Sequence, residues 1–228
     1  MDKNKYTLGE RNITVYKNYD GGDIIYLCES HADDEMMDKI ASRLKKLTGK
    51  TPWSLVIFDV DDWNSALSPW KGKNSKGEEV FGGNGKETLS WIKNFLIPLC
   101  EDNKEFTKRY IAGYSLAGLF SLWSFYESDM FDGAASCSGS LWFDGWEKYI
   151  KSASACGASK VYLSLGMKEE KTNDRLMSTV GDMTRLTYEY IKNDENITDS
   201  ALVMNPGGHF TEPENRIANA VTYLVKGE

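Results

Sequence analysis

The sequence predicts an α/β fold in which helices cover both faces of a mostly parallel central sheet. Short apolar runs typical of buried strands alternate with longer segments whose apolar residues recur every three or four positions. No internal repeat and no Pro-, Gly- or Ser-rich linker divides the 228 residues. We therefore expect a single domain over residues 1–228, with strands and helices in alternation.

The N-terminal elements differ in type from the rest. Residues 12–16 alternate between polar and apolar side chains, and the turn signal at residues 20–22 follows, so we expect edge strands joined by tight turns. The apolar run 24–28 predicts the first buried strand. The next helix should start at the acidic residues 33–35 and end at Gly49. Its apolar positions are Met36, Met37, Ile40, Leu44 and Leu47.

The strand and helix unit then recurs. Residues 55–58 predict a strand, and the helix after it has one apolar face. Residues 110–113 predict a strand that enters the next helix directly. The apolar face of the helix between these two strands consists of Leu89, Ile92, Leu96 and Leu99.

The last third of the chain continues the pattern. Strands are predicted at residues 133–138, 161–165 and 201–204. Thr211 and Glu214 have capping-box spacing at the start of the final helix. A helix is predicted between the last two of these strands, with apolar positions at Leu176, Val180, Met183, Leu186 and Tyr190. The final helix has apolar positions at Ile217, Val221 and Leu224.

Composition and charge exclude several function classes. The chain has 27 basic and 34 acidic residues, a net charge of −7 and no basic block, which argues against nucleic acid as a partner. The uncharged stretch 110–125 contains five Gly and Ser residues and predicts a buried strand and helix, so no membrane span is expected. The first twelve residues hold no apolar run for a signal peptide, which predicts a cytoplasmic protein.

The four cysteines predict neither disulfides nor a metal site. They are far apart and form no C-x-x-C pair, which is typical of reduced thiols. No metal is therefore expected. The sequence is also expected to need no cofactor. They are Cys28, Cys100, Cys137 and Cys156.

A serine follows the predicted central strand. Residues 113–118 read Gly-Tyr-Ser-Leu-Ala-Gly, a G-x-S-x-A-G pattern at a strand-to-helix junction. A nucleophilic serine on such a tight turn needs small neighbours, because the helix packs back against the strand. Ser115 is therefore the candidate nucleophile, and the backbone N–H of Leu116 at the helix start is a candidate oxyanion donor.

A neutral serine hydroxyl needs a base, and the sequence offers two histidines. His209 follows the last predicted strand in a Gly-rich loop and is the candidate base. His31 comes too early in the chain for that role and is expected in a loop beside the site.

A carboxylate is needed to orient the imidazole. Glu169 and Glu170 follow the strand that ends at Leu165, and they lie between the serine and the histidine in sequence. Glu169 is the first choice, Glu170 the second, and Asp144, after the preceding strand, a third.

With these residues identified, the sequence resembles the α/β-hydrolase superfamily over nearly its whole length. More narrowly, GYSLAGLFSLW, LSLGMKEE and NPGGHF are similar to the serine-esterase family that includes esterase D and the siderophore trilactone esterases. The resemblance implies an α/β-hydrolase fold with Ser115 as nucleophile, Glu169 as acid and His209 as base. No HGGG-type oxyanion loop is present, so a second donor is expected in residues 30–32, with His31 included.

The expected substrate pocket is aromatic. Residues 61–85 form a long, irregular segment after a strand, and long loops at this edge are often functional. We expect this segment to be an active-site loop on the substrate side. The candidate substrate-binding residues are Trp63, Asn64, Trp70, Tyr114 and Trp142.

These observations predict a serine hydrolase that cleaves a small-molecule carboxylic ester through an acyl-enzyme. Two alternatives stay open. One is a thioesterase or an amide-cleaving serine hydrolase, because the same residues serve every acyl transfer. The other is a non-catalytic binding protein that keeps the fold.

Overall fold

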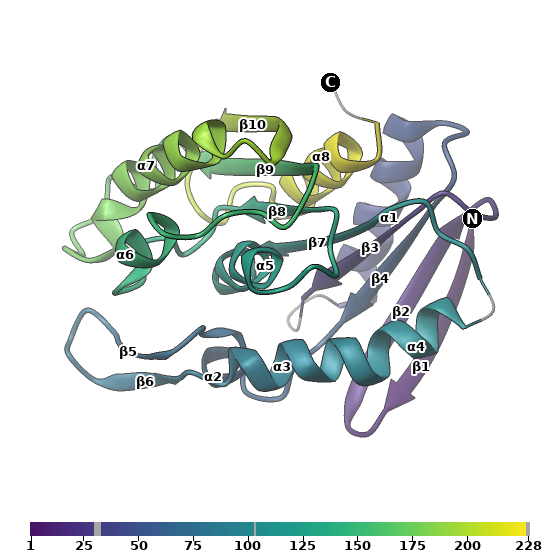
Figure 1. The fold of residues 1–228 in the computed structure, drawn as a ribbon, viewed down its shortest axis with the longest axis horizontal. Coiled ribbons are helices and arrows are strands. Elements are labelled where there is room, and N and C mark those ends of the chain that lie inside the picture. The colour runs from purple at the N-terminus through teal and green to yellow at the C-terminus, as the bar shows by residue number, and fades with distance from the viewer. Residues whose placement is uncertain (30–32, 103, 227–228) are drawn as a thin grey trace.

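An eight-stranded sheet forms the centre of the molecule (Figure 1). The computed structural model describes residues 1–29, 33–102 and 104–226. The sheet has the order β1-β2-β4-β3-β7-β8-β9-β10. Only the β1–β2 and β2–β4 pairs are antiparallel, so the predicted α/β class with a mostly parallel sheet is confirmed. The strands are β1 (Asp2–Leu8), β2 (Arg11–Asn18), β3 (Asp23–Cys28), β4 (Trp53–Phe58), β7 (Arg109–Tyr114), β8 (Gly133–Cys137), β9 (Ser159–Gly166) and β10 (Ile197–Asn205).

Helices cover both faces of this sheet (Figure 1). On one face, α1 (Asp34–Thr48) and α8 (Pro213–Lys226) pack together over a core that contains Ile25 and Leu27. The opposite face is built around the buried helix α5 (Leu116–Glu127) and contains Tyr26. The other helices on this face are α2 (Trp63–Leu67), α3 (Gly85–Trp91), the π-helix η1 (Ile92–Leu96), α4 (Ile97–Glu101), α6 (Trp146–Ile150), the 3-10 helix η2 (Met177–Thr179) and α7 (Val180–Asn193). The alternation of β3 between the two cores explains its continuous apolar run.

The ends of α1 follow the predicted capping chemistry. The side chain of Asp33 accepts a hydrogen bond from the backbone N–H of Met36 at 2.8 Å. At the other end, Gly49 has φ 61° and donates its N–H to the carbonyl of Lys45 at 2.9 Å. Positive φ favours glycine, so the chain leaves the helix at this position.

The helix predicted from Leu89 to Leu99 differs in its buried face. Residues 92–96 form a π-helix, which holds more residues per turn than an α-helix and rotates the residues that follow. Cys100 is therefore 6% exposed, whereas the side chain of Leu99 is 38% exposed.

The apolar stripe predicted for α7 is also displaced. Val180 is buried as expected, but Met183, Leu186 and Tyr190 are only half-buried. Two threonines take core positions on the buried face of this helix. The buried residues are Val180, Gly181, Thr184, Thr187 and Ile191.

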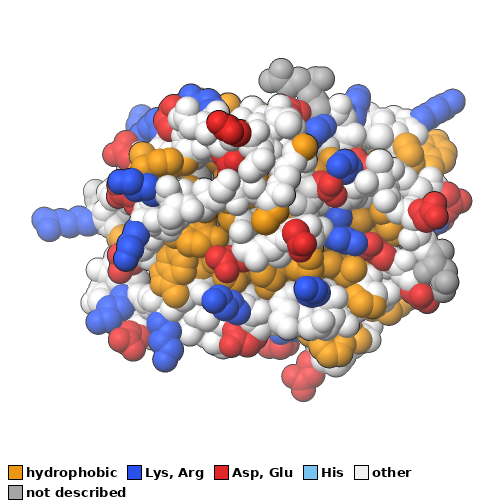
Figure 2. Space-filling view, viewed as in Figure 1, with side chains coloured by type: hydrophobic (Ala, Val, Ile, Leu, Met, Phe, Trp, Pro, Cys, Tyr) orange, Lys and Arg blue, Asp and Glu red, His pale blue; other side chains and the backbone are white. Residues whose placement is uncertain are grey.

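Residues 61–85 are more regular than the sequence indicated. They fold into α2 (Trp63–Leu67) and a hairpin formed by β5 (Lys71–Lys73) and β6 (Glu79–Gly82). The prediction of an irregular loop is wrong because aromatic side chains anchor the hairpin: Phe81 packs against Phe143 with ring centroids 5.0 Å apart. Figure 2 shows apolar side chains gathered on this face, in the region where the hairpin and α6 lie in Figure 1.

The register aligns the carboxyl ends of the central strands. Cys28 of β3 lies opposite Gly113 of β7, and Tyr114 lies opposite Cys137 of β8. At the other side, Gly166 of β9 lies opposite Asn205 of β10. The segments that follow β7, β8, β9 and β10 therefore meet at one edge, which is where open α/β sheets bind ligands.

No helix within the described residues is both long and apolar enough to cross a membrane. All four cysteines are free; Cys28, Cys100 and Cys137 are buried and Cys156 is exposed.

Candidate active site

Ser115 occupies a strained turn between β7 and α5. Its φ of 59° and ψ of −123° are rare for a residue with a side chain. A Cβ at Gly113 would lie 2.2 Å from the carbonyl oxygen of Ala117, so only glycine fits where the helix turns back. The backbone N–H of Ser115 donates to the carbonyl of Cys137 at 3.0 Å. The turn is thus fixed to the neighbouring strand with the hydroxyl at the sheet edge.

His209 reaches this hydroxyl from the loop after β10. Its Nε2 lies 3.1 Å from the Oγ of Ser115, and its Nδ1 lies 2.7 Å from the Oε2 of Glu169. The structure therefore brings together the three residues that the sequence singled out as nucleophile, base and acid. The imidazole is 32% exposed and the Glu169 side chain 4%.

The second oxygen of Glu169 is held by three donors. Oε1 accepts hydrogen bonds from the Oγ of Ser138 at 2.8 Å, the N–H of Gly166 at 2.7 Å and the guanidinium of Arg216 at 2.8 Å. Burial alone would raise the pKa of the Glu169 carboxyl. The hydrogen bonds from His209, Ser138 and Gly166 outweigh burial and lower this pKa below its ordinary value. The carboxylate is therefore ionised at neutral pH.

The two other acids considered from sequence lie elsewhere. Glu170 forms an ion pair with Arg185 of α7 at 2.7 Å. Asp144 is exposed, and its backbone carbonyl accepts a hydrogen bond from the indole of Trp70. Of the three predicted carboxylates, only Glu169 has a hydrogen bond to His209 among the described contacts.

The loop that carries His209 is tied down on several sides. The hydroxyl of Tyr114 donates to the backbone carbonyl of His209 at 2.5 Å. The side chain of Thr211 accepts a hydrogen bond from the N–H of Gly208 at 3.1 Å. At the end of β9, the N–H of Lys168 donates to the carbonyl of Gly207 at 3.0 Å. Tyr114 thus supports the histidine and does not line the cavity described below.

A cavity of about 370 Å³ opens beside Ser115 and His209. Trp142 is the predicted substrate-binding residue that lines it. The apolar part of the wall is completed by Met177, Val180 and Phe210, which sequence reasoning missed. Phe210 is 91% exposed although its ring packs edge-on against the imidazole of its neighbour, with centroids 5.1 Å apart. An apolar residue next to the predicted base was the signal that could have identified it.

The remaining predicted substrate-binding residues are outside the lining of this cavity. Trp63 is half-buried and Asn64 is exposed on α2. Trp70 packs against Phe143 and Tyr149, with ring centroids 5.9 and 5.7 Å away. Trp63 and Trp70 thus pack against the hydrophobic core on this face of the sheet.

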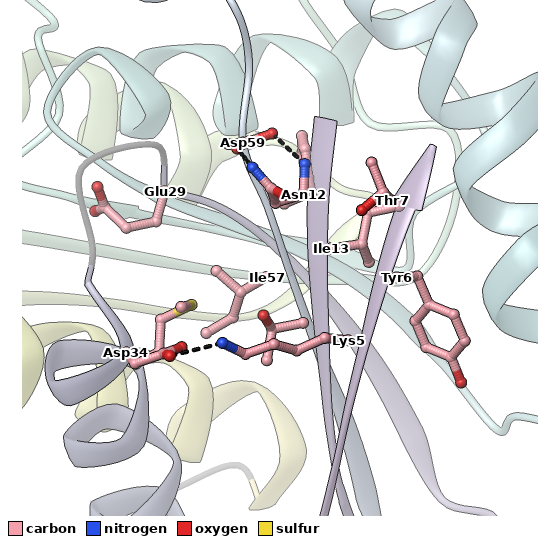
Figure 3. Close-up of a pocket in the computed structure, with 12 residues that line it drawn as sticks. Lys5, Tyr6, Thr7, Asn12, Ile13, Glu29, Asp34, Ile57 and Asp59 are labelled. Atoms are coloured by element: carbon pink, nitrogen blue, oxygen red, sulfur yellow. Dashed lines mark hydrogen bonds and ion pairs between the residues drawn. The ribbon is translucent and has the colours of Figure 1, made fainter. Parts of the chain in front are cut away.

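A second cavity, of about 490 Å³, lies between β1, β2, β4 and α1 (Figure 3). Lys5 forms an ion pair with Asp34 across it at 2.6 Å, and Asp59 accepts two hydrogen bonds from Asn12. None of the residues predicted to act in catalysis lines this cavity among the described positions.

A family model described as "Putative esterase" matches residues 7–211. The chain belongs to this esterase family. Among curated proteins, "Uncharacterized protein YbbA" of Bacillus subtilis (strain 168) is 28% identical over 160 residues, which cover 66% of this chain. The alignment spans 64% of that relative, less than two thirds of its length.

Solved structures share the fold of this esterase-family chain. An IroE-like serine hydrolase from Shewanella oneidensis superposes with a TM-score of 0.82 at 14% identity, covering 99% of this chain and 80% of the other. The siderophore hydrolase EstA from Aspergillus nidulans gives 0.75 at 14% identity, covering 98% and 93%. At such identities the likeness establishes the fold, which is that of α/β-hydrolase-type esterases.

Residues 30–32, including His31, lie outside the described residues, so the expectation of a second oxyanion donor there stays a prediction.

Arg216 was missed from sequence although it contacts Glu169. A cation directly before Ile217, in the first turn of a helix with buried Ala220 and Leu224, was the signal that could have identified it.

Proposed function

We propose that the protein is a serine-dependent carboxylic ester hydrolase, with Ser115 as nucleophile, His209 as base and Glu169 as orienting acid. The observation that carries this proposal is the continuous line of hydrogen-bonding atoms from Ser115 Oγ through both ring nitrogens of His209 to Glu169. Membership of an esterase family supports the same reaction class.

In the first half of the reaction, Ser115 Oγ attacks the ester carbonyl carbon while its proton passes to Nε2 of His209. Glu169 accepts a hydrogen bond from Nδ1, which sets the ring tautomer and stabilises the imidazolium that forms. The tetrahedral intermediate collapses as the bond to the alcohol oxygen breaks. His209 gives its proton to that oxygen, so the alcohol leaves neutral and the acyl group stays on Ser115.

In the second half, water replaces the alcohol. His209 takes a proton from the water as its oxygen attacks the acyl carbon, and the second tetrahedral intermediate then releases Ser115 with that proton returned. The products are one alcohol and one carboxylic acid.

The developing oxyanion needs donors on the side of the serine turn. The N–H of Leu116, at the first position of α5, is one proposed donor because a helix N-terminus favours negative charge. The second donor is proposed within residues 30–32, where the sequence offers Ser30, His31 and Ala32.

The substrate is proposed to be a small-molecule ester with an apolar group on one side of the scissile bond. Trp142, Met177, Val180 and Phe210 supply an apolar wall beside Ser115, and no Lys or Arg is among the described lining residues. A group without negative charge fits this wall best, because an anion there would lose hydration without gaining a cation.

The proposal is tested by the intact mass of the protein after incubation with a fluorophosphonate. One adduct is expected on the wild type and on Ser152→Ala, whose serine is exposed near α6, and none on Ser115→Ala. Hydrolysis of matched ester, thioester and amide substrates then identifies the leaving group. The absence of an adduct on the wild type, together with no ester turnover, would contradict the proposal and favour a binding role.

A further inference from the structure

Arg216 is a buried cation that none of the steps above uses. It lies in the first turn of α8, and its side chain is 3% exposed. Burying a guanidinium is costly unless it is paired and its N–H groups are bonded. Its partners therefore indicate what the residue does.

One terminal nitrogen of Arg216 faces the acid. Nη1 donates to Glu169 Oε1 at 2.8 Å, and it also lies within bonding distance of Ser138 Oγ at 2.9 Å and the Tyr114 hydroxyl at 3.1 Å. Because Oε1 is fixed in this way, the carboxylate has a single rotation, in which Oε2 points to His209.

The other terminal nitrogen faces the histidine loop. Nη2 donates to the carbonyl of Pro206 at 3.1 Å and to the carbonyl of Gly208 at 2.9 Å. Gly208 directly precedes His209 in the chain, and Pro206 lies three residues before it. One planar guanidinium thus joins the acid to the loop that carries the base, and its fork of donors suits this task better than the single ammonium of lysine.

We propose that Arg216 is a positioning residue that fixes the distance and angle between Glu169 and His209. This inference rests on the proposed function, because it assigns to Arg216 an effect on the orientation of the base. We expect its removal to lower activity by about 10- to 100-fold, the range known for residues that orient metal ligands from the outer shell.

The test is a double-mutant cycle of Arg216→Gln and Glu169→Gln, measured by kcat, KM and the rate of fluorophosphonate labelling. Arg216→Gln alone is expected to lower kcat by about 100-fold with KM nearly unchanged. In the Glu169→Gln background, Arg216→Gln is expected to lower kcat by less than about fivefold, because the carboxylate that Arg216 orients is already absent. The ¹H resonance of the Nδ1 proton shared by His209 and Glu169 should be lost or shifted in Arg216→Gln.

A matched control is Arg109→Gln. Arg109 forms a two-point ion pair with Glu101 at the opposite end of β7, so its loss removes a comparable arginine without touching the site. The kcat of Arg109→Gln and the ¹H resonance of its His209 Nδ1 proton should match those of the wild type. Arg216→Lys, which keeps the positive charge but cannot reach the carboxylate and both carbonyls together, is expected to fold and to lose about tenfold in kcat.

The outcomes separate the two proposals. A wild type without turnover or labelling overturns the ester hydrolase itself. If the wild type is active, equal losses from Arg216→Gln in both Glu169 backgrounds overturn the positioning role. An unchanged kcat in Arg216→Lys also overturns the positioning role. This second test applies even if Arg216→Gln does not fold.

Discussion

The Oγ of Ser138 lies 2.8 Å from Oε1 of Glu169, so the residue that follows β8 supports the carboxylate that follows β9. Ser138 is buried and has φ 46°, a conformation that costs free energy in a residue other than glycine. Ser138 thus has a strained backbone, and its hydroxyl donates to the Glu169 carboxylate. Such strain commonly occurs at functional sites.

Ser138→Ala should therefore weaken both stability and turnover. We expect the free energy of unfolding to fall by about 1–2 kcal/mol, since a buried oxygen loses its donor. We also expect kcat to fall by about tenfold, because one of three donors to Oε1 is lost. Urea unfolding and ester hydrolysis measure the two effects. A loss of stability with no change in kcat would limit Ser138 to a structural role.

Glu169→Gln should lower kcat by about 10⁴-fold, because an amide can no longer accept the Nδ1–H of His209 as an anion does. Glu170→Gln is the matched control, since the neighbouring carboxylate pairs with Arg185 and should leave kcat within about twofold. Initial rates on an activated ester measure both. Comparable losses in the two variants would contradict the assignment of Glu169.

Gly113→Ala should prevent the Ser115 turn from closing. The new Cβ would lie 2.2 Å from the carbonyl oxygen of Ala117, so we expect a loss of at least about 3 kcal/mol in the free energy of unfolding, or failure to fold. Gly157→Ala is the control, because its Cβ would meet nothing within 4 Å. Thermal and urea unfolding compare the two variants, and a stable Gly113→Ala protein with normal turnover would rule out this steric requirement.

Trp142→Ala should raise KM by about tenfold for esters with a large apolar group and change KM little for a methyl ester. The reason is that the indole forms part of the apolar wall beside Ser115. Trp70→Ala is the aromatic control, since this ring packs on Phe143 outside the cavity lining. An equal rise in KM for Trp70→Ala would support the substrate-binding role predicted for it from sequence.

Asp23→Asn should change the pH dependence of stability. Burial at the start of β3 raises the pKa of the Asp23 carboxyl from 3.8 to about 6. The folded state therefore binds this proton more tightly than the unfolded state, and the contribution to stability is present below pH about 4 and lost as pH rises through 6.

Replacing the charge should accordingly stabilise the fold at high pH only. We expect Asp23→Asn to raise the free energy of unfolding by about 1 kcal/mol at pH 8, a value reduced for solvent screening of a half-buried group, and by nearly nothing at pH 4. Urea unfolding across this range measures it, with the exposed Asp129→Asn as control. An equal gain in the free energy of unfolding at pH 4 and pH 8 would contradict a raised pKa of Asp23 in the folded state.

Much of the fold could be predicted because its signals are local. Apolar runs mark β3, β4, β7 and β9, and their alternation with helices requires a mostly parallel sheet. The Ser115 turn is readable for the same reason, since small residues at 113, 117 and 118 are needed within a few positions of the serine. The position of His209 after the last strand follows from the order of the elements.

What the sequence by itself determined was the set of segments that meet at the carboxyl edge of the sheet. Only the tertiary structure decided which side chains in those segments face one another. Glu169 and Glu170 are adjacent in sequence, yet one meets His209 and the other Arg185. Arg216 lies 47 residues from Glu169, and no local pattern records that pair. The physical reason is that periodicity depends on neighbours along the chain, whereas pairing of buried charges depends on where packing brings separate elements together.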